Sequence, residues 1–263
     1  MNIKSFVSIS ECTHKVRLGN QHDGGYVVCE HDVNESDFLL SFGVNDDWTF
    51  EESFLSVNSK VSLHAYDHSI DFLVMLTKSF AALPNLVLRR IGLFEFLRRF
   101  LLPARFRSFF AGDNVHFKEK VAIIDLGKFE VSIESIFSRT SSNRIFLKMD
   151  IEGSEYAVLS EIVKRAERVT GMVIEFHDIG IELDGFLSSL SELSNSFDIT
   201  HIHGNNYDSW LRDIEFPNVI ELTLSRKGIH SRKMSNLSAP IPGLDFPNNP
   251  KEKDLSFTLN TAS

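Results

Sequence analysis

Residues 145–159 read IFLKMDIEGSEYAVL. A mostly apolar run ends at Asp150, the turn after it carries Glu152 and Gly153, and a helical pattern of apolar residues follows at once. This order predicts a buried strand, a sharp turn that presents carboxylates, and a covering helix that ends at residues 170–171. Because ligands of open α/β sheets bind outside the carboxyl ends of the strands, we expect Asp150 and Glu152 to face a site. The alternative is that Asp150 only caps the helix.

The composition is that of a globular protein that can bury a full core. The chain has 263 residues, of which 43% are hydrophobic and 24% charged, and its net charge of −9 argues against nucleic acid as a partner. No run approaches the ~18 apolar residues of a membrane span, and the first ten residues lack the apolar core of a signal peptide. We expect a cytoplasmic enzyme or binding protein with one α/β domain over residues 1–263.

The two cysteines, Cys12 and Cys29, suggest neither a disulfide framework nor a metal-binding C-x-x-C motif. Unpaired cysteines behave as small buried hydrophobic residues, and disulfides are rare in reducing compartments. We therefore expect both thiols to be unpaired, in agreement with a cytoplasmic location.

A second apolar run, residues 38–43, ends in Gly43 and is followed by Asp46 and Asp47. The pattern predicts a strand, a glycine turn and a helix over residues 49–57. Glycine in such a turn lets the backbone approach a nucleotide-like ligand closely. The turn lacks a G-x-G-x-x-G motif, which disfavours a dinucleotide.

The strand predicted over residues 61–67 ends on Asp67, 24 positions after Gly43. A carboxylate about 20 residues beyond a glycine turn is placed to accept hydrogen bonds from ribose hydroxyls. The alternative is that Asp67 only caps the following helix. The spacing joins Gly43 and Asp67 into one candidate nucleoside site.

Further elements continue the alternation of strands and helices that is typical of one α/β domain. The pattern predicts a hairpin at 22–29, helices over 70–83 and 184–196, and strands over 85–88, 114–124, 172–177, 199–203 and 219–225.

The strand predicted over residues 172–177 ends in Glu175 and His177, which are two positions apart and therefore share a face. Together with Asp150 from the neighbouring strand they offer oxygen and nitrogen ligands for a divalent cation, or an acid–base pair. The alternative is a histidine that is merely hydrogen-bonded.

The stretch from Arg89 to Arg107 holds six arginines and a single acid, Glu95, interleaved with Phe and Leu. A basic amphipathic helix broken at Pro103 is expected. Three interpretations stay open: a solvated helix or self-association surface of a homo-oligomer, a lid over an anionic substrate, and a helix that contacts the membrane peripherally through residues 89–107.

Several separate stretches together resemble the FkbM-type methyltransferases, a branch of the class I S-adenosylmethionine-dependent enzymes. The resembling segments occur in family order and are HDGGYVV (22–28), SFGVNDDWTFE (41–51), AYDHS (65–69), FLKMDIEGSEYAVL (146–159), VIEFHDI (173–179), HIHGNNY (201–207) and LDFPNNP (244–250). KMDIEGSEY is the most specific of them. Residues 89–112 show no family motif, so we expect a basic helical insertion there.

The resemblance implies a Rossmann-like class I methyltransferase fold, with a seven-stranded, mostly parallel sheet whose last strand is antiparallel. It implies that Gly43 and its loop bind the methionine part of S-adenosylmethionine and that Asp67 binds the ribose. Asp46 or Asp47 meets the ammonium group, and Asp150 lies at the same site. Backbone donors and carboxylates suit a cofactor that has no phosphate.

The resemblance also implies methyl transfer to a hydroxyl oxygen of a sugar, a glycan or another natural product. On this view His177 or His203 acts as the base, while Asp150 and Glu175 orient it or, with His177, hold Mg²⁺ or Mn²⁺. The rival hypothesis is a binding protein of the same fold that retains the pocket without chemistry.

Overall fold

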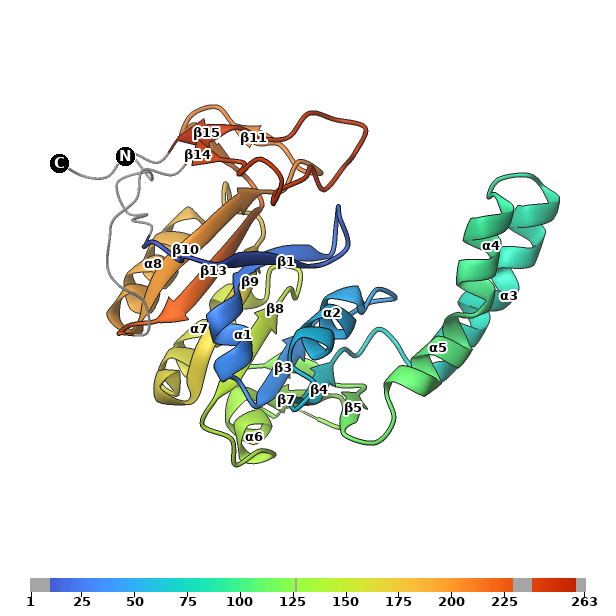
Figure 1. The fold of residues 1–263 in the computed structure, drawn as a ribbon, viewed down its shortest axis with the longest axis horizontal. Helices are drawn as coiled ribbons and strands as arrows, with labels where there is room; N and C mark the ends of the chain where they lie inside the picture. Colours follow the sequence, from blue (N-terminus) through green and yellow to red (C-terminus); the bar gives the residue numbers. More distant parts are fainter. Residues whose placement is uncertain (1–9, 126, 229–237, 259–263) are drawn as a thin grey trace.

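The structure, a computed structural model, describes residues 10–125, 127–228 and 238–258. Its centre is a seven-stranded sheet in the order β10-β13-β9-β8-β3-β4-β5 (Figure 1). The strands of this sheet span Phe38–Phe42 (β3), Ser62–Tyr66 (β4), Asn114–Phe117 (β5), Ile145–Met149 (β8), Val169–Phe176 (β9), Phe197–Gly204 (β10) and Ile220–Arg226 (β13). Strand β13 is antiparallel to both of its neighbours, and the other pairings are parallel. This is the predicted Rossmann-like class I methyltransferase sheet with a reversed last strand.

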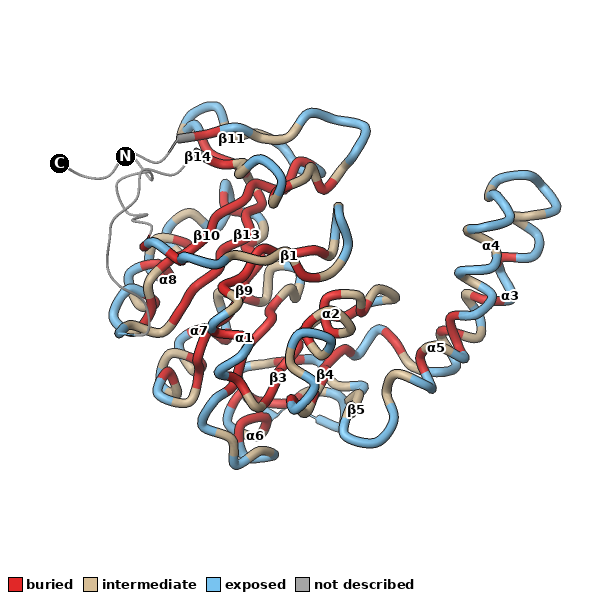
Figure 2. Tube along the Cα trace, in the orientation of Figure 1, coloured by how far each residue is buried: buried red, intermediate tan, exposed pale blue. Residues whose placement is uncertain are grey.

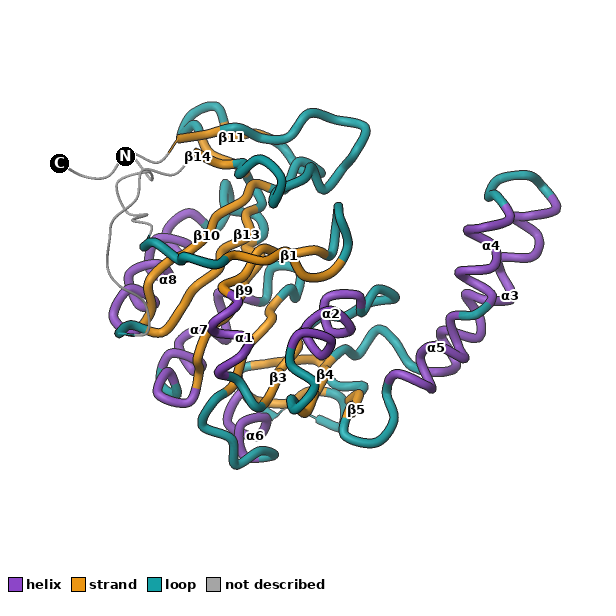
Figure 3. The backbone as a smooth tube through the Cα atoms, in the orientation of Figure 1, coloured by secondary structure: helices purple, strands orange, loops and turns teal. Residues whose placement is uncertain are grey.

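Helices cover both faces of the sheet. Strands and helices alternate along much of the chain (Figure 3). The covering helices are α1 (Glu30–Glu35), α2 (Thr49–Val57), α6 (Ile133–Ser138), α7 (Glu155–Val163) and α8 (Leu183–Ser196). Leu40 and Leu147 belong to the core that contains α6, α7 and α8 residues, whereas Leu39 and Phe146 belong to the core of α1 and α2. Because successive strand residues point to opposite faces, the continuous apolar runs of β3 and β8 fill both cores.

The predicted hairpin is formed by β1 (Lys15–Gly19) and β2 (Gly25–Cys29), which pair antiparallel. Its register sets Lys15 opposite Cys29, so the residues just before β1 lie near the end of β2. There Cys12 and Cys29 form a disulfide. The expectation of two unpaired thiols is therefore wrong, because hairpin register rather than spacing along the chain brings the sulfurs together, and cysteine usage no longer supports a reducing compartment.

Three helices form an arm that extends away from the sheet (Figure 1), namely α3 (Phe72–Val87), α4 (Leu93–Phe100) and α5 (Leu102–Phe109). The predicted break near Pro103 is confirmed, since α4 ends at Phe100 and Pro103 lies in the first turn of α5. The strand predicted over residues 85–88 is wrong. Helix α3 continues through Pro84 to Val87, and the third parallel strand is β5.

The central strand–turn–helix unit begins as predicted, but its helix is shorter. Helix α7 ends at Val163, a short 3₁₀ turn (η2, Ala166–Arg168) follows, and residues 170–171 already belong to β9. Small two-stranded pairs complete the fold: β6 (Lys120–Ala122) with β7 (Glu130–Ser132), β11 (Trp210–Leu211) with β12 (Phe216–Pro217), and β14 (Ser238–Ala239) with β15 (Phe257–Thr258). Within the described part of the chain, no helix has both the length and the apolar character needed to cross a membrane.

Candidate active site

A cavity of about 970 Å³ lies at the carboxyl ends of four neighbouring parallel strands. Its wall includes Gly43, Asp67, Asp150 and His177, each of which directly follows one of the strands β3, β4, β8 and β9. Ligands of doubly wound sheets bind at this edge. The volume is at the upper end of the range for small-molecule sites.

Gly43 is required by a close approach of two strand ends. Its φ is 75°, and a Cβ there would lie 1.6 Å from the carbonyl oxygen of Asp150. The ammonium of buried Lys148 donates a hydrogen bond to the carbonyl of Gly43. The backbone of β8, rather than a ligand, therefore explains the glycine, and the turn it permits forms the wall of the cavity.

Asp67 fastens the loop after β3 to the end of β4. One carboxylate oxygen accepts from the backbone N–H groups of Val44 (2.9 Å) and Asn45 (2.8 Å), and the other accepts from the N–H and hydroxyl of Ser69 (2.8 and 2.6 Å). Burial alone would raise the pKa of Asp67, but these hydrogen bonds lower it below its usual value. Asp67 does not cap α3, since Asp71 does.

Asp46 and Asp47 line the same part of the cavity. Asp46 forms an ion pair of 3.1 Å with Lys78 of the arm. Asp47 accepts hydrogen bonds from the N–H of Thr49 (3.1 Å) and from the side-chain amide of Asn20. With Asp67 they make this half of the cavity strongly acidic.

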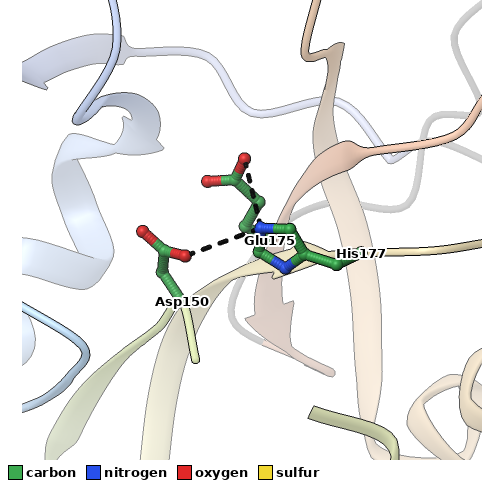
Figure 4. Close-up of side chains that lie close together, drawn as sticks. All are labelled: Asp150, Glu175 and His177. Carbon is green, nitrogen blue, oxygen red and sulfur yellow. Dashed lines mark ion pairs between the residues drawn. The ribbon is translucent and has the colours of Figure 1, made fainter. Parts of the chain in front are cut away.

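The structure brings Asp150, Glu175 and His177 together on the cavity wall (Figure 4). Nε2 of His177 is 3.9 Å from Oδ1 of Asp150 and 3.9 Å from Oε1 of Glu175. One ligand atom of each residue lies within 4.8 Å of the others, a spacing at which they could hold a metal ion. Asp150 does not cap α7, whose N-cap is Ser154. Three predicted residues thus meet, as their strand-end positions indicated.

Two further residues that sequence reasoning missed contact this cluster. The hydroxyl of buried Tyr26 lies 3.1 Å from Oδ2 of Asp150 and 3.0 Å from Oε2 of Glu175. The ammonium of Lys148 is 3.8 Å from Oδ2 of Asp150. The sequence nevertheless marks both residues. Tyr26 begins the apolar run in HDGGYVV, and Lys148 interrupts the apolar run that leads into KMDIEGSEY.

A third missed residue is Glu155, in the first turn of α7. Its carboxylate is fully buried, accepts from the N–H of Ile151 (2.9 Å), and lies 3.1 Å from Nδ1 of His177. A carboxylate on one ring nitrogen orients the imidazole, so the opposite nitrogen points toward Asp150 and Glu175.

The pKa values of Glu175 and His177 are raised because the negative charges of the cluster are crowded and poorly solvated. Burial, together with the charges of Asp150 and Glu221, raises the pKa of Glu175 well above its usual value. Burial alone would lower the pKa of His177, but the hydrogen bond to Glu155 and the nearby carboxylates raise it to about 9. Excess negative charge at this point therefore attracts a positive one, either a proton on His177 or a cation.

His203 does not join the other predicted residues. It is fully buried, with Nδ1 3.2 Å from Oε2 of Glu221 and Nε2 3.1 Å from Oδ1 of Asp254, and it does not line the cavity. Both ring nitrogens therefore serve a network between β10, β13 and the C-terminal segment. The proposal of His203 as the base is withdrawn for this reason.

No family model matches the chain, and no curated protein matches it. Similar solved structures include the fibrillarin/Nop5p complex, at 13% identity over 73% of each chain with a TM-score of 0.38. Another is Methanococcus jannaschii fibrillarin, a pre-rRNA processing protein, at 10% identity over 75% of this chain and 69% of that one with a TM-score of 0.40. A third is Geobacter metallireducens precorrin-6y C5,15-methyltransferase, at 9% identity over 75% and 86% with a TM-score of 0.38. At these scores the similarities carry no functional argument, and the class I methyltransferase fold rests on the strand order and the reversed β13.

Proposed function

We propose that this protein binds S-adenosylmethionine in the described cavity and transfers its methyl group to a hydroxyl oxygen of a sugar, a glycan or another natural product. The observation that carries the proposal is that two different half-sites share one cavity at the strand ends. One half is the acidic loop region around Asp67, and the other is the Asp150–Glu175–His177 cluster.

The acidic half fits the cofactor by charge. S-adenosylmethionine carries an ammonium group, a sulfonium and one carboxylate, and so is a cation overall. Asp46, Asp47 and Asp67 line this part of the cavity without a phosphate-binding glycine motif. All four hydrogen bonds that Asp67 accepts come from the loop and from Ser69, so a ribose hydroxyl would replace the Ser69 hydroxyl. The turn at Gly43 would support the methionine part.

The second half fits the acceptor. Bound S-adenosylmethionine supplies an electrophilic methyl group. The acceptor oxygen must be aligned with that carbon and must lose its proton as the new bond forms. We assign the proton to Nε2 of His177, because Glu155 holds the opposite nitrogen at 3.1 Å and fixes the ring. Since the pKa of His177 is raised to about 9, the neutral imidazole that accepts this proton prevails only above that pH. Glu175, hydrogen-bonded to Asn205 at 2.7 Å, and Asp150 orient the acceptor.

Alternatively, the same three residues would bind a divalent cation, in which case Nε2 of His177 would be a ligand and not the base. Two carboxylates and an imidazole form an oxygen and nitrogen donor set that suits Mn²⁺ and, less closely, Mg²⁺. Tyr26 and Glu155 supply the hydrogen bonds around the ligands that metal sites use to orient them. A cation there would polarise the acceptor hydroxyl.

Calorimetric titration of S-adenosylmethionine tests the proposal. We expect micromolar binding by the wild type and roughly tenfold weaker binding by Asp67→Asn, about 1.4 kcal/mol. Glu192→Gln, which changes a half-buried carboxylate of α8 outside the cavity, should bind like the wild type. A folded wild type that binds neither S-adenosylmethionine nor S-adenosylhomocysteine would overturn the proposal. Cofactor binding without methyl transfer to any compound in a screen of hydroxylated acceptors would instead favour the non-catalytic binding protein.

A further inference from the structure

Figure 2 shows exposed residues along much of the arm formed by α3, α4 and α5, and many of them are large and apolar. Eleven of the 17 large hydrophobic residues that are exposed in the described chain belong to this arm. Its exposed members are Phe72, Leu73, Phe80, Leu83, Val87, Leu88, Leu93, Phe94, Leu97, Phe100 and Leu101. Monomeric soluble proteins rarely expose contiguous patches of this kind, and such patches mark interaction sites.

These side chains form stripes rather than a random scatter. In α4 none of the eight residues is buried, and Leu93, Phe94, Leu97 and Phe100 lie within about 120° of one another around the helix axis. In α3 the exposed apolar residues likewise occupy a stripe beside the residues that pack inward. The apolar stripes therefore stay exposed although the three helices of the arm pack against one another.

The charge of the arm indicates which kind of partner covers the apolar stripes. Residues 72–109 contain seven basic residues and one acid, Glu95, within a chain of net charge −9. Two of the seven, Lys78 and Arg105, are paired with Asp46 and Glu52 outside the arm, and the arm still keeps a net positive charge. Glu95 is already bound by Arg98 at 2.8 Å and Arg99 at 2.5 Å, and Arg89 and Arg90 are exposed at the tip between α3 and α4. An apolar stripe flanked by arginines is the pattern of helices that lie in the interface of an anionic membrane.

A second copy of the chain that pairs arm to arm suits the apolar stripes less well. Contact between two arms would bring a net positive charge of the same size onto each apolar stripe, and like charges opposed across an interface are costly. An anionic bilayer instead offers acyl chains to the stripes and phosphate groups to the arginines. We propose that the α3–α5 arm docks on a membrane surface that contains anionic lipid.

The arm also reaches the cavity. Phe94, Glu95 and Arg98 of α4 contribute to the cavity wall, and Lys78 of α3 is paired with Asp46 at 3.1 Å. A docked arm would therefore hold the mouth of the cavity against the lipid surface. If the proposed methyl transfer is correct, on which this last step rests, the acceptor is a hydroxylated head group carried on a lipid.

Vesicle co-sedimentation tests the docking without S-adenosylmethionine. Phosphatidylcholine vesicles with about one-third phosphatidylglycerol should pellet the wild type, while pure phosphatidylcholine vesicles or 1 M salt should release at least tenfold more protein to the supernatant. Two variants should lose pelleting: Leu93→Ser/Leu97→Ser, which shortens the apolar stripe, and Arg89→Glu/Arg90→Glu, which reverses charge at the tip. Ile181→Ser is the matched control, since Ile181 is 84% exposed but lies outside the arm.

Control measurements of folding and oligomeric state distinguish the possible outcomes of this experiment. Circular dichroism should show native helicity in all variants, and their affinity for S-adenosylmethionine should equal that of the wild type, because Leu93, Leu97, Arg89 and Arg90 do not line the cavity. Failure of the folded wild type to pellet with anionic vesicles overturns the proposal. So does a stable dimer that Leu93→Ser/Leu97→Ser dissociates, since a second copy is then the occupant. Loss of cofactor binding with pelleting intact would reject only the proposed function.

Discussion

Oε1 of Glu155 lies 3.1 Å from Nδ1 of His177, and the same carboxylate accepts the backbone N–H of Ile151. Glu155 is fully buried, and its other oxygen has no hydrogen-bond partner within the described residues. A buried carboxylate is costly unless it is paired. Its position is therefore explained by its two partners, the turn after β8 and the imidazole that faces the cavity.

If the cluster binds a cation, Glu155 should act on it through His177. We expect Mn²⁺ to bind the wild type, as measured by electron paramagnetic resonance of free Mn²⁺. Glu155→Gln should weaken that binding about 10–100-fold, the usual effect of removing a carboxylate behind a ligating histidine. Asp150→Asn should reduce it further, because Asp150 would be a direct ligand.

Glu192→Gln removes a carboxylate charge outside the cavity and should leave Mn²⁺ binding unchanged. A folded wild type that binds no Mn²⁺ would remove the metal from the proposal. In that case His177 and its neighbours remain an acid–base cluster.

Gly43→Ala should disrupt the site by distorting the backbone. The added Cβ would meet the carbonyl oxygen of Asp150 at 1.6 Å, and the φ of 75° is unfavourable for alanine. We expect a loss of about 3 kcal/mol or more in the free energy of unfolding, measured with urea. Gly112→Ala is the matched control: its φ is 67°, but nothing lies within 4 Å of the added atom. That control should lose only about 1 kcal/mol. Equal losses of unfolding free energy in the two variants would show that the contact with Asp150 is not the reason for glycine at position 43.

The sheet could be predicted because buried parallel strands are continuous apolar runs. Residues 38–42 and 145–149 are entirely buried, and their flanking turns carry the polar residues of the cavity. A short apolar run, in contrast, can belong to a helix as well as to a strand. Residues 85–88 follow Pro84 and suggest a strand, yet α3 continues to Val87, and the N–H of Leu88 still donates to the carbonyl of Pro84 at 2.9 Å.

The site was predictable where chemistry and strand ends coincide. Asp150, Glu175 and His177 follow or end adjacent strands, so topology alone brings them together. Glu155 has the sequence position of an ordinary acid in the first turn of a helix, and Tyr26 that of a residue in a hairpin. Only the packing of the hairpin against the sheet carries Tyr26 to Asp150, and no spacing along the chain encodes that distance.

His203 offers a test of the buried network at the other end of the sheet. Burial alone would lower its pKa, but hydrogen bonds to Asp254 and Glu221 raise it from 6.5 to about 10. Because the folded-state pKa exceeds the unfolded one, the stabilisation is complete below about pH 6.5 and is lost as pH rises through about 10. Its size is on the order of a few kcal/mol.

Urea unfolding of the wild type and His203→Gln between pH 6 and 10 measures this effect. The wild type should be more stable than the variant at pH 6, and the difference should shrink steadily toward pH 10, because only the wild type then loses a proton that folding holds in place. His14→Gln, which changes an exposed histidine, should show no such convergence. Parallel stability curves for the wild type and His203→Gln would mean that His203 is neutral in the folded protein.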